Sequence, residues 1–353
     1  MKKFLTIIIF LFLLVGCENN LTNNYLGGPH YFDAMGTAVG VTLYDGKEED
    51  LDQIKAIFDL YSQLTTNFRR NEVLPDNPYY GLENIYTINQ NAGIKAVEVR
   101  EELIELIQYA LEISDETDGY FNIAIGKAVD IWKSVIEEYI FGEVPTEIYQ
   151  NALAQVLSLT EIDLTKIIID EENKTVYLTD NSIKLDLGGI SKGYAVQKAS
   201  EYLVSQGIEK FMINAGTSSI SVGIHKENRP FRIGLQDSKQ IYENSLLGVL
   251  QAQDTHLSIG GNAEQHTFYQ GMIIHHIISP FDFQPKNYYT SISLVGDNAG
   301  LIDAYSTAVF LMEETQTIEF LDSHGLKYVI YLANDELLTN LDEEEFKKSK
   351  LIN

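Results

Sequence analysis

The sequence predicts an α+β fold. Segments with helical periodicity and short strand-like segments are mixed along the chain without a regular strand–helix–strand rhythm, which argues against a doubly wound parallel sheet. Hydrophobic residues make up 45% of the chain, enough to form a core. The main body of about 320 residues exceeds the usual size of one domain, so we expect either one large domain or two fused lobes.

The N-terminus resembles a bacterial lipoprotein signal. Lys2 and Lys3 precede an apolar run over residues 4–15, and Gly16 stands before Cys17. This run is shorter than the stretch of apolar residues that a transmembrane helix usually needs. We therefore expect residues 1–17 to be a signal peptide with a lipobox, Cys17 to be lipidated, and the protein to be anchored on the extracytoplasmic face of the cell membrane. The alternative is an ordinary signal peptide with a chance cysteine. Cys17 is the only cysteine, so no disulfide is expected.

The rest of the chain divides into three expected parts. Residues 18–29 are polar and predict a flexible tether. Residues 30–345 form the expected folded body, and residues 346–353 the tail. The formal net charge of −26 argues against nucleic-acid binding and against close contact with anionic lipid head groups. Solubility is the simplest explanation for that charge.

The first half of the body predicts mainly helices. Residues 37–44 alternate as a strand does, residues 52–64 place apolar side chains at helical spacing, and residues 67–91 are rich in Asn, Pro and Tyr and predict a loop. Residues 101–113 form a clear amphipathic helix with its apolar face at Leu103, Ile104, Ile107, Ala110 and Leu111. A further helix is expected to begin near Pro145.

The second half predicts more strands. We expect them at residues 167–169, 175–178, 211–214, 231–235, 248–251, 272–278 and 291–294. Helices are expected from about residue 301 to 312 and near 317–322. Residues 342–348 are highly charged and predict a solvated terminal helix or a frayed end.

The most informative segment is residues 186–194 (DLGGISKGY). It follows a strand-like run at 182–185 and opens a helical pattern. Paired glycines allow a tight turn that brings backbone N–H groups near a ligand, a helix N-terminus adds partial positive charge, and Lys192 adds a full one. These features predict a phosphate cradle, although an ordinary strand-to-helix turn with a cap could have the same pattern.

Two further clusters carry candidate chemistry. Asp303, Ser306 and Thr307 are spaced to share one helix face, and their hard oxygen atoms suit Mg²⁺. A polar helix face near a cap is the alternative. In the strand expected at 272–278, His275 and His276 should point in opposite directions, and a histidine there can equally be a packing residue.

The glycine-rich segment resembles the central signature of the ApbE family, the FAD:protein FMN transferases. Four other segments match that family in the right order: residues 34–37 (AMGT), 119–126 (GYFNIAIG), 275–280 (HHIISP) and 303–308 (DAYSTA). The resemblance covers roughly residues 31 to 312. It implies a two-lobed fold with a T-fold-like core, FAD as substrate and Mg²⁺ as cofactor.

The resemblance also implies roles for individual residues. Asp303 and Thr307 match the metal-binding positions, with the Gly189 carbonyl as a third ligand and Ser306 as a further one. His276 matches a histidine that could act as a general base near its working pKa at neutral pH. The expected flavin and phosphate contacts are Met35, Phe68, Tyr120, Phe121, Asn122, Asp186, Lys192 and Ile278.

Two segments depart from the family pattern. Ser279 replaces the usual Asp before Pro280, and Phe281-Asp282 follow where a Thr-Gly pair is usual. Residues 214–219 (NAGTSS) replace a Gly-Gly-Asn or Gly-Gly-Asp sequence. Both departures put full catalytic competence in question.

The implied activity is transfer of FMN from FAD to a Thr or Ser hydroxyl of an exported acceptor, an electron-transfer subunit or lipoprotein, with release of AMP. One alternative is an FAD pyrophosphatase that yields FMN and AMP. Another is a flavin-binding lipoprotein without turnover. A purely structural surface lipoprotein would require all five matches to be coincidental.

Overall fold

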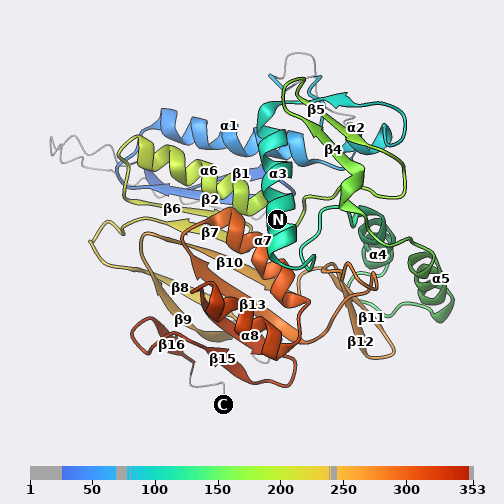
Figure 1. Cartoon of the computed structure of the whole chain (residues 1–353). Helices are drawn as coiled ribbons and strands as arrows, with labels where there is room; N and C mark the ends of the chain where they lie inside the picture. The colour runs from blue at the N-terminus through green and yellow to red at the C-terminus, as the bar shows by residue number, and fades with distance from the viewer. Residues whose placement is uncertain (1–25, 69–77, 80, 238, 240–244, 350–353) are drawn as a thin grey trace, which may run out of the picture.

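The computed structural model describes residues 26–68, 78–79, 81–237, 239 and 245–349. The signal peptide, Cys17 and most of the expected tether lie outside the described residues. Within them, helices and antiparallel strands are mixed, which confirms the predicted α+β class (Figure 1). In the described part of the chain, no helix combines the length and apolarity needed to cross a membrane.

A large antiparallel sheet forms the centre of the molecule. Its eight strands follow the spatial order β1 (Gly27–Ala34), β2 (Thr37–Leu43), β6 (Phe211–Ala215), β7 (Ser219–Val222), β10 (Thr255–Gly261), β13 (Tyr289–Gly296), β14 (Lys327–Leu332) and β15 (Leu337–Thr339). Neighbouring strands are antiparallel throughout. Side chains of a strand alternate between faces, so Ser258 of β10 contacts the helical layer while Leu257 packs in the core on the other side.

Helices cover one face of this sheet. They are α1 (Glu48–Thr65), α6 (Ser191–Ser205), α7 (Ala299–Phe310) and α8 (Glu314–Ser323), and α3 (Glu101–Glu116) packs against α7. In Figure 1, α6 and α7 lie next to each other over β6, β7 and β10, with α1 beyond α6. An antiparallel sheet covered by helices on one side agrees with the expected T-fold-like core.

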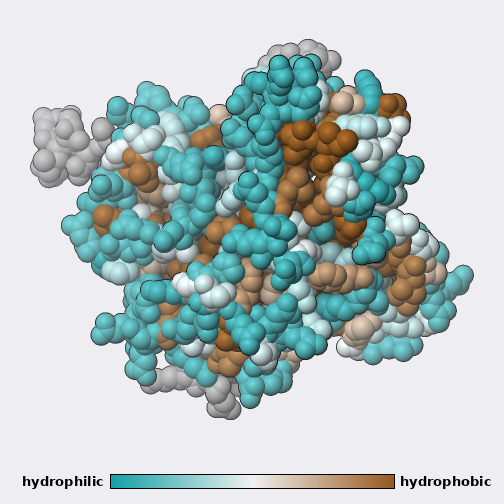
Figure 2. Space-filling model, viewed as in Figure 1, coloured by the Kyte–Doolittle hydropathy of each residue, from teal (hydrophilic) through white to brown (hydrophobic). Residues whose placement is uncertain are grey.

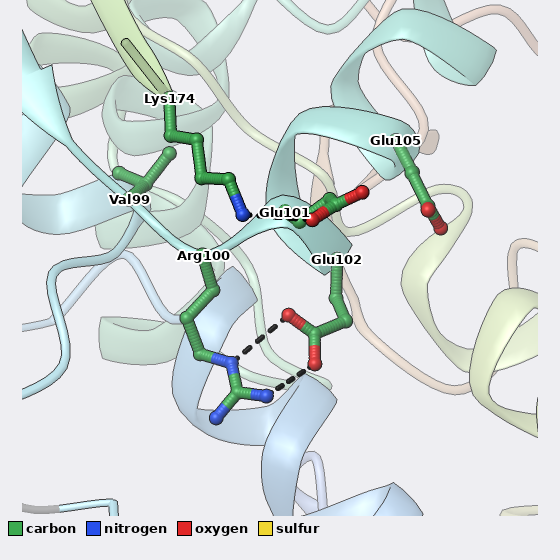
Figure 3. A pocket seen from close by; sticks show the side chains of 6 residues that line it. All are labelled: Val99, Arg100, Glu101, Glu102, Glu105 and Lys174. Atoms are coloured by element: carbon green, nitrogen blue, oxygen red, sulfur yellow. Dashed lines mark hydrogen bonds and ion pairs between the residues drawn. The ribbon is translucent and has the colours of Figure 1, made fainter. Parts of the chain in front are cut away.

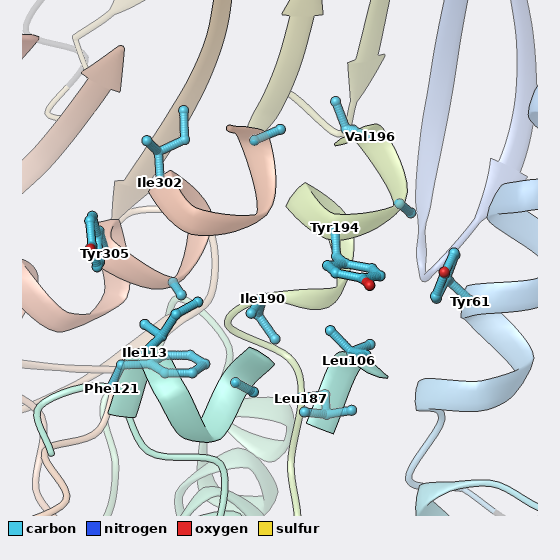
Figure 4. Close-up of a cluster of buried hydrophobic side chains, with 14 of the residues drawn as sticks. Tyr61, Leu106, Ile113, Phe121, Leu187, Ile190, Tyr194, Val196, Ile302 and Tyr305 are labelled. Atoms are coloured by element: carbon cyan, nitrogen blue, oxygen red, sulfur yellow. The ribbon is translucent and has the colours of Figure 1, made fainter. Parts of the chain in front are cut away.

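The apolar residues of the glycine-rich turn are part of the main hydrophobic core. Leu187 and Ile190 are buried, with relative exposures of 1% and 0%. Figure 4 shows them between α3 and α7, near Phe121, with Tyr194 facing Tyr61 of α1. Burial of such side chains contributes roughly 1.5–3 kcal/mol each. The core therefore fixes the turn, and the polar residues of the turn are held in place with it.

A three-stranded sheet covers the other face of the central sheet. It consists of β8 (Phe231–Gln236), β9 (Leu246–Ala252) and β16 (Phe346–Lys348). The expectation of a terminal helix or frayed end is therefore wrong for the last of these segments. Phe346 is 4% exposed and packs in a second core, and that burial holds β16 against β9.

A smaller lobe contains α4 (Gly126–Glu138), α5 (Thr146–Leu157) and the hairpin β11 (His266–Tyr269) to β12 (Met272–His275). It has its own core around Trp132, Ile274 and Ile278. Above this lobe in Figure 1 lies a three-stranded sheet together with α2 (Ile85–Gln90). The strands of this sheet are β3 (Val97–Glu98), β5 (Thr175–Leu178) and β4 (Ile167–Asp170). The two-lobed architecture agrees with the expectation.

Some local predictions were wrong. The strand-like run at 182–185 forms only an isolated bridge between Lys184 and Ile125. The loop expected at 67–91 contains α2, which Asn84 caps by accepting a bond from Thr87 N. The strand expected at 272–278 ends at His275. The strand β1 begins at Gly27, within the last residues of the expected tether.

Candidate active site

Several backbone N–H groups of the glycine-rich turn make hydrogen bonds within the turn. Asp186 Oδ1 accepts from Gly188 N at 2.8 Å, and the N–H groups of Ile190 and Ser191 both donate to Leu187 O. The expectation that many amides would face a ligand is therefore wrong for these groups. The positive charge of Lys192 in the first turn of α6, together with the helix N-terminus, is the main anion-attracting feature.

A polar network connects this turn to the segment after α1. Asn67 Nδ2 donates to Asp186 Oδ2, and Asn89 Nδ2 donates to Asn67 Oδ1, both at 2.8 Å. Asn89 also pairs with the backbone of Leu185. The network places Phe68, which is 62% exposed, one residue away from the contact with Asp186. The ammonium group of Lys133 lies 4.3 Å from the centre of the Phe68 ring.

Asp303 is buried in the interior of the protein. Its exposure is 7%, and its carboxylate accepts from Gly193 N at 2.8 Å and from Ser219 Oγ and Ser258 Oγ at 3.1 Å. Burial raises the pKa of Asp303 above its ordinary value, and the nearby charge of Lys192 acts in the opposite direction. A buried, hydrogen-bonded carboxylate thus lies beside a cation.

The backbone of α6 makes this arrangement possible at Gly193. A Cβ atom at this position would lie 2.3 Å from Ala299 O and 2.4 Å from Asp303 Cβ. Only glycine allows α6 and α7 to approach so closely. The same contact brings the Gly193 N–H to the carboxylate of Asp303.

The other expected metal ligands lie around the same helix. A Cβ atom on Gly189 would be 3.0 Å from Thr307 Oγ1, so the turn and Thr307 are in contact. Ser306 instead faces β10: its hydroxyl donates to Asp303 O and accepts from Ser258 Oγ. The structure thus brings Gly189 and Thr307 together and directs Ser306 elsewhere.

This donor set suits a hard cation. The desolvated carboxylate of Asp303, the hydroxyl of Thr307 and the carbonyl of Gly189 would be oxygen ligands of the kind that Mg²⁺ prefers. No group of three or more His, Cys, Asp or Glu residues capable of holding a metal occurs among the described residues. Asp303 would therefore be the charged ligand, with neutral oxygens completing the protein's share.

His276 follows the end of β12 and is exposed, whereas His275 is completely buried. Desolvation by the surrounding protein lowers the pKa of His276 below its ordinary value, bonding to the Gln265 backbone opposes this, and Lys192 lowers it further. The lowered pKa leaves the imidazole neutral at pH 7, where it can accept a proton. His275 is instead a packing residue, with Nε2 2.8 Å from Lys286 O.

The expected contacts at residues 120–122 divide into half-buried and buried side chains. Tyr120 donates its hydroxyl to Gln316 Oε1 at 2.9 Å. Phe121 is buried, and its ring would lie 3.3 Å from a Cβ on Gly189. Asn122 accepts from Ala124 N and shapes its own turn. Ile278 is 5% exposed and belongs to the core of the smaller lobe, so it supports the segment that carries His276.

The turn at Met35 meets the altered segment at 214–219. Gly216, with φ of 63°, lies so close to Thr37 that a Cβ would be 2.2 Å from Thr37 Oγ1. Thr217 also has positive φ, and its hydroxyl donates to Glu264 Oε1 at 3.3 Å. Met35 is partly buried and its N–H donates to Ser62 Oγ at 3.4 Å. A hollow of about 440 Å³ lies here, lined by Asp33, Ala34, Gly36, Thr37 and Ala38.

A larger hollow of about 570 Å³ lies elsewhere, around Val99 and Arg100 at the start of α3 (Figure 3). Four of its charged groups form two pairs: Arg100 with Glu102, and Lys174 with Glu101. None of the expected site residues lines it. Figure 2 shows hydrophilic residues over most of the visible face, with hydrophobic residues gathered in a recess beside α3.

The departure at Ser279 preserves a local structural role. Its hydroxyl accepts from Phe281 N at 3.3 Å, a bond that an aspartate carboxylate at this position could also make. Ser279 is buried and its N–H donates to Gln284 O. Sequence reasoning treated this substitution as a possible loss of competence, but the turn that it supports is intact.

Known proteins resemble this chain in sequence. The ApbE family model matches residues 35–330. The FAD:protein FMN transferase of Vibrio cholerae serotype O1 is 21% identical over 98% of both chains, and that of Klebsiella pneumoniae is 27% identical over 78% of this chain and 79% of its own.

Solved structures share the fold. The ApbE protein of Thermotoga maritima superposes with a TM-score of 0.73 at 21% identity, covering 91% of this chain and 99% of its own. The flavin transferase ApbE from Vibrio cholerae gives 0.68 at 18% identity, covering 88% and 96%. Because the family model spans most of the sequence, the chain belongs to the ApbE family.

Proposed function

We propose that this protein transfers FMN from FAD to a Thr or Ser hydroxyl of an acceptor protein and releases AMP. The observation that supports this best is the position of the Asp303 carboxylate at the start of α6, where it accepts from Gly193 N within the field of the Lys192 charge, beside the contact between Gly189 and Thr307. One cation and one carboxylate around a tight turn suit a pyrophosphate and its counter-ion. The curated relatives named above carry this activity in their names.

The proposed reaction is a phosphoryl substitution. The acceptor hydroxyl oxygen bonds to the FMN-side phosphorus of FAD, and the bond from that phosphorus to the bridging oxygen breaks. AMP leaves with the bridging oxygen, and the acceptor gains a phosphoester. The neutral imidazole of His276 is available to take the hydroxyl proton.

Lys192 would bind phosphate oxygens and oppose the negative charge that grows on AMP. A bound Mg²⁺ would supply further neutralisation of phosphate charge, held by Asp303, Thr307 and the Gly189 carbonyl, with Ser306 as a more distant candidate. The turn and the close contact of α6 with α7 fix these groups before substrate arrives. No nucleophile from this chain is needed, because the acceptor provides it.

A direct assay tests the proposal. The protein is mixed with FAD, Mg²⁺ and a Thr-containing acceptor, and the mass of the acceptor is measured. The acceptor should become heavier by one FMN phosphoester, and EDTA should abolish this increase in mass. AMP without acceptor modification would instead support FAD hydrolysis. Bound flavin with neither product would identify a binding protein and refute the transferase.

We also propose that the protein acts at the extracytoplasmic face of the cell membrane, tethered by lipid on Cys17, on exported flavin-carrying electron-transfer proteins. Cys17→Ala should move the protein from the membrane to the soluble fraction, because a lone thiol is the acylation point. The measurement is fractionation followed by immunoblotting. A variant that stays in the membrane fraction would contradict the anchor.

A further inference from the structure

The loop after His276 is held in one shape by several contacts. Ser279 Oγ accepts from Phe281 N, and Ser279 O accepts from Phe283 N at 2.9 Å. Trp132 Nε1 donates to Phe283 O at 2.6 Å, and Phe283 is itself 8% exposed. An ion pair between Asp282 and Lys286 spans the end of the loop. The position of residue 281 is therefore set by its neighbours.

Phe281 is nevertheless 61% exposed. Its ring meets the ring of Tyr120 at a centroid distance of 4.8 Å and an angle of 73°, an edge-to-face contact. Tyr120 is fixed in turn by its hydrogen bond to Gln316 of α8. The loop thus holds a large apolar ring in contact with solvent. The ring gains the free energy of hydrophobic burial only when a ligand covers it.

This aromatic pair lies next to the proposed phosphate site. Phe121, the residue after Tyr120, lies against Gly189. A Cβ atom on Gly189 would be 3.3 Å from the Phe121 ring and 3.0 Å from Thr307 Oγ1. A dinucleotide with its pyrophosphate at Lys192 extends a planar ring system from each end. The exposed ring of Phe281 contacts Tyr120, the neighbour of Phe121, and is therefore suitably placed to contact one of these rings.

We infer that Phe281 is a substrate-specificity residue that packs against a planar heteroaromatic ring of the dinucleotide, with Tyr120 and Gln316 as its support. The inference rests on the proposed function. Adenine and isoalloxazine share the chemistry that such a platform recognises, and the test separates them.

Phe281→Leu keeps an apolar side chain and removes the ring. Dissociation constants for FAD, FMN and AMP are measured on the variant and the unaltered protein by titration calorimetry. We expect FAD binding to weaken about three- to tenfold, the size typical of one aromatic contact. A parallel loss for AMP but not FMN assigns adenine, and a loss for FMN but not AMP assigns isoalloxazine. Unchanged constants for all three ligands overturn the inference.

Two further variants sharpen the result. Phe281→Trp should restore affinity, because it restores a ring, whereas failure of rescue would contradict ring packing. Tyr31→Leu is the matched control: Tyr31 is 71% exposed and neighbours Phe32, which packs on Phe58 of α1, so it points to the opposite face of the sheet. Its change should leave all three constants unaltered.

The outcomes separate this inference from the proposed function. Normal FAD binding that is insensitive to Phe281→Leu removes the aromatic platform and leaves FMN transfer untouched. Ring-dependent binding by a protein that transfers no FMN removes the transferase and keeps the platform. An unaltered protein that binds none of the three ligands refutes both.

Discussion

Asp303→Asn is expected to reduce FMN transfer by about a thousandfold, or ~4 kcal/mol of activation free energy, without unfolding the protein. The substitution keeps the shape of the side chain and removes the negative charge that would hold the cation. Asn Oδ1 can still accept from Gly193 N, and the hydroxyls of Ser219 and Ser258 can rotate to accept from Nδ2. The measurement is the rate of acceptor modification at saturating FAD and Mg²⁺.

Alanine is the wrong substitution at this position. The carboxylate of Asp303 connects α6, β7 and β10, so its removal leaves two buried donors, Gly193 N and Ser219 Oγ, without their acceptor, at about 1–3 kcal/mol for each unsatisfied group. Ser258 then keeps only its bond to Ser306 Oγ. Lost activity in Asp303→Ala would then have two explanations. The asparagine variant separates charge from hydrogen bonding.

Thermal stability provides a readout independent of activity. Burial raises the pKa of Asp303, so the folded state holds this proton more tightly than the unfolded chain does. The associated stability is complete below the ordinary pKa and is lost as the pH rises through the raised value. At neutral pH a bound cation should offset that cost, and Mg²⁺ should raise the melting temperature of the unaltered protein but not of Asp303→Asn. Equal shifts in both proteins would contradict the metal assignment.

Lys192→Gln is expected to raise the dissociation constant for FAD about ten- to a hundredfold, because it removes a charge-assisted contact with phosphate. Calorimetric titration with FAD measures this directly. Lys192 also lowers the pKa values of both Asp303 and His276, so its removal should raise both. The pH dependence of transfer should therefore move to higher pH.

Lys198→Gln is the matched control on the same helix. Lys198 is paired with Glu201 and lies 5.1 Å from the centre of the Tyr194 ring. The change removes the same charge from α6 at a distance from the turn, and FAD affinity should stay unaltered. Equal losses in the two variants would mean that only the total charge matters, and that Lys192 has no specific contact with phosphate.

The helices were easier to predict from sequence than several of the strands. The helices α1, α3, α5 and α6 show clear apolar spacing and were expected. The strands β7 and β10 were missed, because Ser219, Ser221 and Ser258 interrupt any apolar pattern. Two of those serines face the carboxylate of Asp303, so the residues that obscure the strands also belong to the candidate site.

The composition of the site was predicted better than its geometry. Motif spacing identified Asp303, Thr307 and the glycine-rich turn. It could not show that Asp303 is buried, because its partners lie 45 to 110 residues away in sequence. Gln316 was missed because a glutamine on a surface-like helix has no local signal, and its role depends on the fold that brings α8 to Tyr120.

The closeness of α6 and α7 at Gly193 also offers a way to sort related sequences. Any larger residue there would collide with Ala299 O and with Asp303 Cβ, forcing the two helices apart. A relative that retains Asp303 and Lys192 but carries another residue in place of Gly193 would hold the same functional groups at altered separations. A related protein with a larger residue at position 193 is therefore expected to be less active, even where every chemically reactive side chain has been kept.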